Sequence, residues 1–434
     1  MSRQTNPAEV PLAAFVRRSG ALYCEDVPLQ ELAQRFGTPL YVYSRRAILD
    51  AYGQYQRALS GRASLICYAV KANSNLGVLN LLARAGSGFD IVSGGELARV
   101  LAAGGAAECT VFSGVGKTEQ EIERALRAQI MCFNVESDFE LQTISTVAAR
   151  LRRRAPVSLR VNPQIDPGTH PYIATGLKSS KFGVAYEQAI ELYRRAAADP
   201  HLEVIGIDCH IGSQIAQAAP FEQAADRLLD LVERLEHQRI GLHHLDFGGG
   251  LAIAYRSDGE APPTIAEWVG AIVRRVDARG HGGKTLLVEP GRSVVGPAGA
   301  LLMQVIGWKQ GAAGAFAVVD AAMNDQMRPA LYDAWMDVQP VVARSEPPRG
   351  FAIADVVGPI CESGDWLARG RMLSVEAGDV LAMLGAGAYG MSMASNYNSR
   401  LRAAEVIVDG SQAYCVRRRE RVEDLMVGES IVPD

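Results

Sequence analysis

The chain has 434 residues, of which 48% are hydrophobic, and its formal net charge is -4. This length allows more than one packed core, and the small negative charge argues against a surface for nucleic acid. No apolar stretch is long enough for a signal peptide or a membrane span, so we expect a cytoplasmic protein with small-molecule partners. The seven cysteines show no Cys-x-x-Cys pair and no zinc spacing, which predicts reduced thiols and no metal site.

From about residue 65 to residue 288, short β-branched or aromatic runs alternate with stretches rich in Ala, Leu, Glu and Arg. This alternation is typical of βα units around a parallel sheet. Eight units predict a closed (β/α)8 barrel. An open doubly wound sheet is the alternative, although no dinucleotide fingerprint follows the first strand. The expected strands are Leu65–Val70, Phe89–Val92, Thr110–Phe112, Met131–Val135, Val157–Val161, Val204–Cys209, Leu245–Phe247 and Leu286–Val288.

The segments that flank the predicted barrel have a different sequence pattern. A run at Leu40–Tyr43 precedes it and is expected to lie outside it, and the chain after Pro290 consists of short runs punctuated by Gly and Pro. Such runs predict a mostly β domain. Its expected strands are Ala300–Ile306, Ala315–Val319, Ile353–Val357, Asp379–Met383 and Glu405–Val408. We therefore expect an N-terminal segment (1–36) that packs on the β domain, a barrel (37–292) and a C-terminal β domain (293–434).

Several chemically capable residues follow the predicted barrel strands, where barrel enzymes build their sites. Lys71, in Tyr-Ala-Val-Lys-Ala-Asn, could be a desolvated nucleophile for a carbonyl, although a strand-end lysine is usually a solvated cap. The triple glycine 248–250 allows close approach to a phosphate, or it forms only a tight turn. Glu289 and Arg292, in Glu-Pro-Gly-Arg, could serve a pyridine ring or form a rim salt bridge. His210 could stack on a flat ring, but a lone histidine is more often structural.

The predicted β domain contains three further motifs. Arg328 and Tyr332 would share a helix face, and an arginine fork suits a carboxylate. Cys361 and Glu362 lie in a turn-rich loop, where they could act as a proton donor and an amine ligand. Tyr389 lies in the Gly-rich run 385–390, which could equally be a plain β-turn.

Together and in this order, these motifs resemble the fold type III pyridoxal-phosphate decarboxylases, and most closely the bacterial diaminopimelate decarboxylases. The resemblance covers nearly the whole chain, including the stretch 175–183 with Lys178 and Ser179, and no motif position departs from the family pattern. It implies pyridoxal 5'-phosphate bound covalently at Lys71, His210 stacked on its ring and Glu289 at its pyridine nitrogen. Gly248, Gly249, Gly250, Gly291 and Arg292 would cradle the phosphate, with Tyr389 nearby, and Cys361 would return a proton after carbon dioxide leaves. The resemblance also implies a head-to-tail homodimer in which the Cys361 loop completes the partner's site.

The substrate prediction rests on charge at the far end of the substrate. Diaminopimelate carries both an amine and a carboxylate there, and Arg292, Arg328 and Glu362 complement that pair, with Tyr332 and Tyr389 as further substrate contacts. Ornithine or lysine would leave arginines unpaired. We therefore expect decarboxylation of meso-2,6-diaminopimelate to L-lysine and CO2, the last step of lysine biosynthesis. The alternatives are an ornithine, arginine or carboxynorspermidine decarboxylase, a non-catalytic relative that binds cofactor, and a racemase on the same barrel.

Overall fold

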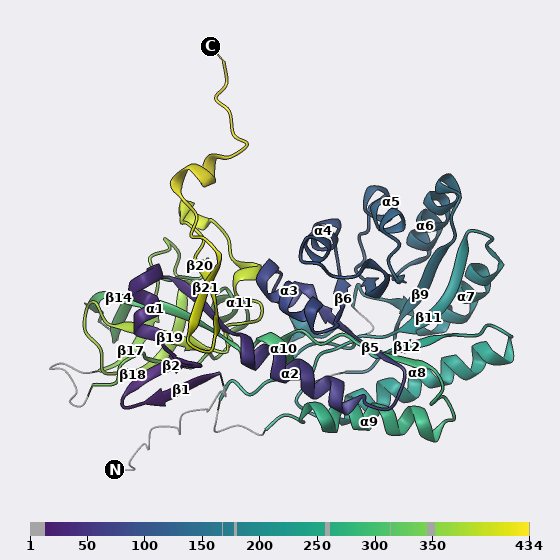
Figure 1. The fold of residues 1–434 in the computed structure, drawn as a ribbon, viewed down its shortest axis with the longest axis horizontal. Helices are drawn as coiled ribbons and strands as arrows, with labels where there is room; N and C mark the ends of the chain where they lie inside the picture. The colour runs from purple at the N-terminus through teal and green to yellow at the C-terminus, as the bar shows by residue number, and fades with distance from the viewer. Residues whose placement is uncertain are drawn as a thin grey trace. The chain divides into compact units, whose positions relative to one another are not determined.

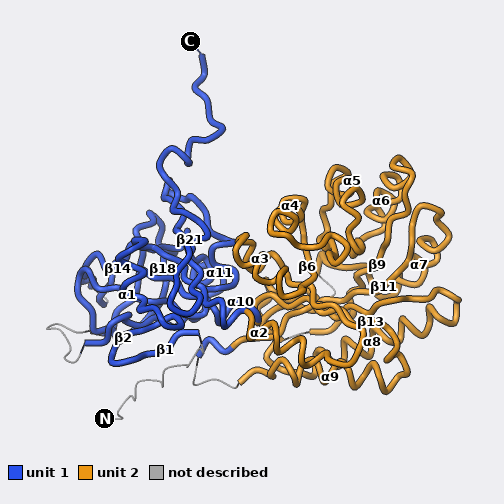
Figure 2. The backbone as a smooth tube through the Cα atoms, viewed as in Figure 1, with its two compact units in different colours: residues 1–48, 254–259, 294–434 blue, residues 49–253, 260–293 orange. Residues whose placement is uncertain are grey.

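A computed structural model of the chain describes residues 14–166, 168–177, 180–256, 261–312, 314–344 and 352–433. The chain forms two compact units (Figure 2). Unit 1 comprises residues 1–48, 254–259 and 294–434, and unit 2 comprises residues 49–253 and 260–293. Lys178 and Ser179 lie outside the described residues.

Unit 2 is built on a closed barrel of eight parallel strands, which confirms the predicted fold class (Figure 1). The strands follow one another around the barrel in chain order, and pairing of β8 with β9 and of β13 with β5 closes it. The short strand β10 (Val184–Ala185) adds to β9. The barrel strands are β5 (Ser64–Ala69), β6 (Gly88–Ile91), β7 (Thr110–Phe112), β8 (Cys132–Val135), β9 (Ala155–Asn162), β11 (Leu202–Asp208), β12 (His244–Asp246) and β13 (Thr285–Val288).

Amphipathic helices connect the strands and lie outside the barrel (Figure 1). Their starts follow capping chemistry: Thr118 and Glu121 form a capping box at α5, and Thr264 and Glu267 form another at α9. The helices of this unit and its border with unit 1 are α2 (Arg45–Ala58), α3 (Leu76–Arg84), α4 (Gly94–Ala102), α5 (Glu119–Ala128), α6 (Asp138–Leu151), α7 (Ala189–Ala198), α8 (Ala219–His237), α9 (Ile265–Ala278) and α10 (Arg292–Val295). Single 3-10 turns occur at η1 (Val70–Ala72), η2 (Ala107–Cys109), η3 (Pro171–Ile173) and η4 (Tyr186–Gln188).

The interior of the barrel changes from apolar to polar along the strands. A buried cluster of Cys67, Val111, Cys132 and Leu287 fills one level. Side chains of a strand alternate between its two faces, so inward-facing positions recur every two residues. The next such level lies one step toward the carboxyl ends of the strands. That level is polar and buried, with Asp90, Asn134, Arg160, Asp208 and Asp246. The barrel therefore holds its buried charges at the end where the candidate site residues lie.

Unit 1 contains a nine-stranded mixed sheet and a small antiparallel sheet of β1 (Phe15–Arg18), β2 (Ala21–Cys24) and β3 (Val27–Pro28). The large sheet contains every strand that we expected after Pro290. Its members are β4 (Leu40–Ser44), β14 (Gly299–Gln310), β15 (Ala315–Val319), β16 (Val338–Pro340), β17 (Ala352–Val357), β18 (Trp366–Leu373), β19 (Val380–Leu384), β20 (Ala404–Asp409) and β21 (Gln412–Arg417). The helical elements are α1 (Leu29–Phe36), α11 (Arg328–Tyr332), η5 (Met391–Met393), η6 (Tyr397–Ser399) and η7 (Val422–Met426).

The N-terminal residues that are described pack on the large sheet (Figure 1). The backbone N–H of Leu22 donates to the Val341 carbonyl at 2.8 Å, and Leu29 and Leu32 of α1 join one buried cluster with residues of β14, β19 and β20. Strand β4 pairs with both β14 and β20, so this run lies outside the barrel. Unit 1 consequently extends to residue 48, whereas the sequence-based division began the barrel at residue 37.

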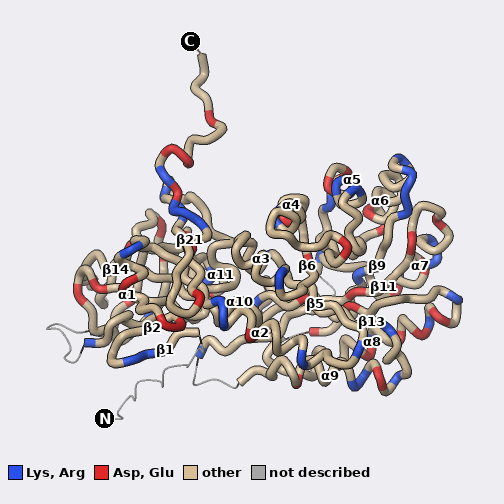
Figure 3. The backbone as a smooth tube through the Cα atoms, viewed as in Figure 1, with Lys and Arg blue, Asp and Glu red and all other residues tan. Residues whose placement is uncertain are grey.

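Basic and acidic residues are interspersed along the backbone of both units (Figure 3). This mixture agrees with the formal net charge of -4. Among the described residues, no helix combines the length and the apolar composition that crossing a membrane requires.

Candidate active site

Lys71 lies at the carboxyl end of β5, in the 3-10 turn η1. Its ammonium group forms an ion pair with Asp90, which lies on the neighbouring strand β6, where Ala69 and Asp90 are paired residues. The Lys71 side chain is 34% exposed, whereas the Asp90 side chain is fully buried. The lysine therefore reaches from a buried anchor toward the open end of the barrel, as a group that reacts with a ligand must.

The triple glycine forms a sharp turn after β12. Gly248 and Gly250 have φ values of +62° and +105°, which side-chain-bearing residues rarely adopt. A Cβ on Gly249 would collide with the Glu289 carbonyl, and one on Gly250 with the Gly212 carbonyl. The Gly248 amide donates to Asp246 at 2.9 Å, and the Gly249 amide donates to Nδ1 of His210 at 3.1 Å. The turn therefore requires glycine at all three positions and is fixed to its neighbours.

His210 follows β11 and is held from both sides. Its Nδ1 accepts the Gly249 amide, and its carbonyl accepts the Thr175 hydroxyl at 2.7 Å. Burial, together with the cations Arg160 and Lys71, lowers the pKa of His210 well below its usual value. A neutral imidazole whose Nδ1 accepts carries its proton on Nε2. The flat, uncharged ring is thus presented in one tautomer and one orientation.

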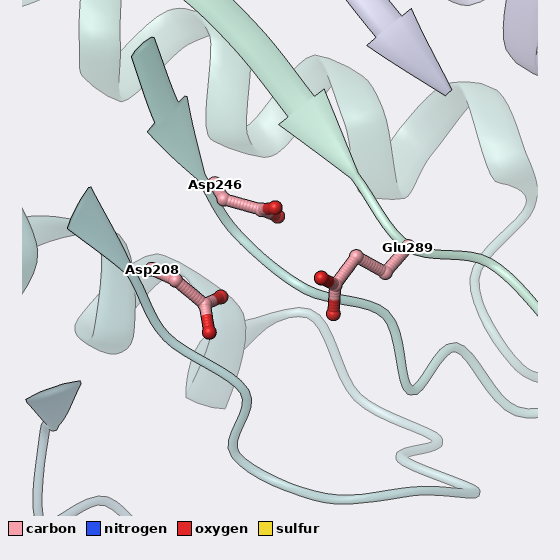
Figure 4. Close-up of side chains that lie close together, drawn as sticks. All are labelled: Asp208, Asp246 and Glu289. Carbon is pink, nitrogen blue, oxygen red and sulfur yellow. The ribbon is translucent and has the colours of Figure 1, made fainter. Parts of the chain in front are cut away.

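Three carboxylates from the ends of neighbouring barrel strands lie close together (Figure 4). Asp208 ends β11, Asp246 ends β12 and Glu289 follows β13, and one oxygen of each lies within 4.8 Å of one from each of the other two. All three side chains are at least 95% buried. Burial raises the pKa of all three above the usual value, and that of Asp246 rises to about 7. Repulsion from Asp246 adds to the rise for Asp208 and Glu289, and repulsion from Asp90 adds to it for Asp246. We call these residues the carboxylate trio.

Arg292 follows the Glu289-Pro290-Gly291 turn and begins α10. Its guanidinium donates to the Ser213 hydroxyl, with Nη2 at 2.9 Å and Nε at 3.3 Å, and the residue is buried. The turn packs tightly, since a Cβ on Gly291 would lie 2.9 Å from the Cβ of Ala72. Arg292 and Gly291 are therefore held near the end of β5, the strand that carries Lys71.

Arg328 and Tyr332 lie in unit 1, at the two ends of α11. The expected helical turn is present, and residues four apart in a helix lie on one face. Arg328 is 6% exposed, and its guanidinium lies 4.5 Å from the centroid of the Tyr255 ring. One of its terminal nitrogens also lies 3.2 Å from the sulfur of Met336. The guanidinium is thus oriented by stacking on an aromatic ring.

Cys361 and Glu362 lie in the loop between β17 and β18. The loop is fixed by the buried Asp365, whose carboxylate accepts the backbone amides of Ile360 at 2.8 Å and Met323 at 2.7 Å. The Cys361 amide donates to Asn398 at 2.7 Å. The thiol and the carboxylate are exposed, so a fixed backbone presents two solvent-accessible functional groups.

Tyr389 lies in the glycine-rich loop after β19 and has a positive φ of 54°. The glycines around it are required by close packing: a Cβ on Gly390 would lie 2.6 Å from the Tyr41 hydroxyl, and one on Gly387 would collide with the Val295 carbonyl. The phenol is therefore carried by a strained and closely packed turn.

The predicted site residues thus fall into two groups, each described within its own unit. The barrel end of unit 2 brings together Lys71, His210, Gly248, Gly249, Gly250, Glu289, Gly291 and Arg292. Unit 1 carries Arg328, Tyr332, Cys361, Glu362 and Tyr389. The partners of these residues were not predicted from the sequence: Asp90, Arg160, Asp208, Ser213, Asp246, Tyr255, Asp365 and Asn398. The signal available for Asp90, Asp208 and Asp246 was a single acid inside an otherwise apolar predicted strand.

The barrel residues fit a phosphorylated pyridine aldehyde. The glycine turn leaves no room for a Cβ, as a backbone cradle for a phosphate requires. A lysine, a neutral ring and a buried carboxylate lie at the same rim, and they match the aldehyde, the ring face and the ring nitrogen of such a group. The donor set is therefore complementary to pyridoxal phosphate.

Comparisons with known proteins agree with this chemistry. Residues 45–296 match the family described as pyridoxal-dependent decarboxylase, pyridoxal binding domain. A diaminopimelate decarboxylase of Pseudomonas fluorescens is 56% identical over 97% of this chain and 100% of its own length. The structure is similar to that of the Helicobacter pylori diaminopimelate decarboxylase complexed with L-lysine, with a TM-score of 0.87 and 41% identity over 92% of this chain and 98% of that one. The structure is also similar to that of the M. jannaschii diaminopimelate decarboxylase in complex with L-lysine. The TM-score is 0.92, and the sequence identity is 37% over 98% of this chain and 99% of that one. The chain belongs to the diaminopimelate decarboxylases, within the pyridoxal-dependent decarboxylase family.

Proposed function

We propose that this chain converts meso-2,6-diaminopimelate into L-lysine and carbon dioxide, the last step of lysine biosynthesis, with pyridoxal 5'-phosphate as cofactor. The observation that carries the proposal is the meeting of Lys71, His210 and Glu289 at one barrel rim, in a chain 56% identical to a diaminopimelate decarboxylase. The finding that two similar structures hold L-lysine agrees with lysine as the product. A cytoplasmic location suits a biosynthetic enzyme with free thiols.

The barrel residues hold the cofactor. Lys71 would bind it covalently, the neutral His210 ring would stack on it, and Glu289 would pair with its ring nitrogen. Gly248 to Gly250 and the Gly291–Arg292 turn surround the phosphate, with Tyr389 nearby. Because the amides of Gly248 and Gly249 already donate within the protein, these two residues contribute shape more than hydrogen bonds. When bound, the cofactor accepts the electron pair that remains after carbon dioxide leaves.

The protein's own contribution to the reaction is to place the substrate and to move a proton. Cys361 carries an exposed thiol on a backbone fixed by Asp365 and Asn398, and we assign it as the acid that protonates the substrate carbon. Arg292, Arg328, Tyr332, Glu362 and Tyr389 bind the substrate. Arginine forks suit the far carboxylate, and Glu362 suits the far ammonium. A diamine-forming substrate would leave one buried arginine without its anion.

The site is shared across a homodimer in which the Cys361 loop of one subunit reaches the barrel of the other. Mixing two inactive variants, Lys71→Ala and Cys361→Ala, tests this arrangement. If subunits exchange, mixed dimers contain one site with both residues intact, and up to about a quarter of the wild-type activity returns for random pairing. No return of activity, with subunit exchange verified by tagged chains, would mean that each site is complete within one subunit.

The reaction itself is tested by incubating the holoenzyme with meso-diaminopimelate and measuring lysine and carbon dioxide together. Equal amounts of the two products, with dependence on added pyridoxal phosphate in the apoprotein, would support the proposal. Consumption of diaminopimelate without lysine would contradict it.

A further inference from the structure

In the described part of the chain, three acidic side chains at the carboxyl end of the barrel form close ion pairs with a basic side chain, but three other buried acids do not. Lys71 pairs with Asp90, Lys117 pairs with Glu140 at 2.6 Å, and Arg160 pairs with Glu136 at 3.0 Å. The carboxylate trio remains after these pairs are formed. The contact that reaches it from a cation is long, since Nε of Arg160 lies 4.0 Å from Asp208. Among the described residues, the ion pairs within 4 Å thus leave the three buried acids with one long contact to a cation.

The carboxylate trio also accepts few hydrogen bonds, which is an observation independent of the ion pairs. Among the described residues, both side-chain oxygens of Asp208 and Oδ2 of Asp246 are buried and accept no hydrogen bond from a nitrogen or hydroxyl donor. The other Asp246 oxygen accepts the Gly248 amide, and Glu289 faces Asn134 at 3.4 Å. Buried oxygens rarely lack a donor, and the trio's oxygens lie within 4.8 Å of one another. A proton carried by one of these acids can supply the missing donor.

We propose that Asp208 and Asp246 are positioning residues that hold protons shared within the carboxylate trio, so that Glu289 alone carries negative charge toward the cofactor's ring nitrogen. This inference rests on the proposed role of Glu289. It extends that role by assigning the neighbouring acids as the group that sets when Glu289 ionises.

The electrostatics of the trio support proton sharing. Burial, followed by repulsion from Asp246, raises the pKa of Asp208, and burial with repulsion from Asp246, Asp90 and Asp208 raises that of Glu289. Like charges this close cannot all ionise in a buried site. The charged or titratable groups facing the trio are Lys71, Asp90, Glu136, Arg160 and the buried thiols Cys67, Cys132 and Cys209, while His210 is neutral.

The first test is infrared spectroscopy of the metal-free apoprotein at pH 8, read at the carbonyl stretch of protonated carboxylic acids. We expect such a band in the wild type and a weaker one in Asp208→Asn, Asp246→Asn and the double variant. Burial also raises the pKa of Asp325 and of Glu96 to about 7, so the trio's contribution is the difference between wild type and variants. Asp50→Asn, at an exposed position on α2, is the matched control.

The second test is the pH dependence of pyridoxal phosphate affinity, followed by cofactor absorbance. Under proton sharing, Asp208 and Asp246 are neutral acids that can donate hydrogen bonds to the ionised Glu289. Replacing both with alanine removes these donors, so the acid limit of binding should move up by about one pH unit or more. A downward move would mean that ionised Asp208 and Asp246 repel Glu289, and it would overturn proton sharing. Circular dichroism verifies that each variant is folded. The wild-type infrared band is measurable even if a variant fails to fold.

The outcomes separate the two proposals. If Glu289→Gln binds the cofactor with wild-type affinity and pH profile, the proposed role of Glu289 fails, whereas the infrared result still decides proton sharing. Absence of a protonated-acid band in wild-type apoprotein, or an unchanged band in both variants, would overturn proton sharing. A rise in the apoprotein's melting temperature on adding Mg²⁺ that is lost in the double variant would also overturn it, because the trio would then bind a cation.

Discussion

Lys71 and Asp90 form an ion pair across two neighbouring barrel strands, with the carboxylate fully buried and the lysine partly exposed. This pair anchors the amine at the rim where the glycine turn and Glu289 also lie. Replacing Lys71 with Ala should lower turnover by about 10³-fold or more, because the cofactor loses its covalent anchor. Reduction of the wild-type holoenzyme with borohydride, followed by peptide mass spectrometry, should find the cofactor mass on Lys71.

Lys309→Ala, at an exposed position of β14, is the control for this variant. Cofactor mass on a different lysine would contradict the assignment.

Cys361→Ala should keep the absorbance of the bound cofactor and lose most turnover. The cysteine is assigned to deliver a proton, and a positioned acid contributes about 10²-fold or more to a rate. Steady-state kinetics and absorbance spectra of the variant check both parts. Cys415→Ala is the matched control, because Cys415 is a second exposed free cysteine. A Cys361→Ala enzyme as fast as the control would remove Cys361 from the mechanism.

Arg328→Gln should lower kcat/KM for diaminopimelate by about 10- to 100-fold, because a charge-assisted hydrogen bond to the far carboxylate contributes about 1.5–3 kcal/mol. The loss should appear mainly in KM. Arg369→Gln, at an exposed position of β18, is the control. Melting curves verify that the buried Arg328 is not needed for folding. A loss no larger than that of the control would place the substrate carboxylate elsewhere.

Gly249→Ala should destabilise the protein by about 1–3 kcal/mol and weaken cofactor binding, since its Cβ would collide with the Glu289 carbonyl. Gly283→Ala is the control, because a Cβ there would meet no atom within 4 Å and no positive φ is required. Thermal unfolding of both apoproteins and titration with pyridoxal phosphate measure the two effects. Equal melting temperatures for the two variants would show that the turn accommodates a Cβ at position 249 with little loss of stability.

The strands of the barrel could be predicted within a residue or two because their buried runs are apolar and are bounded by turn residues. Strands β18 and β21 were missed, since both contain arginines and exposed positions and so lack a continuous apolar run. The run at Leu40–Tyr43 was expected outside the barrel, but its sequence could not reveal the pairing with β14 and β20. That pairing depends on contacts between segments more than 250 residues apart.

The site was predicted less completely than the fold. Motif residues such as Lys71 and Cys361 stand out in the sequence, whereas Asp208 and Asp246 are ordinary strand-end acids until closure of the barrel brings them to Glu289. Asp365 and Asn398 act through backbone amides, and a contact of that kind has no sequence motif. These contacts can be identified only when the closure of the barrel and the register of its strands are known.

The proposed substrate specificity is tested by carbon dioxide release from meso-diaminopimelate, ornithine, arginine and lysine, measured in parallel with the purified holoenzyme. We predict release from diaminopimelate alone, with lysine as the product, because Arg292, Arg328 and Glu362 together complement an amine and a carboxylate at the far end. Release from ornithine, arginine or lysine but not from diaminopimelate would contradict that account of the site.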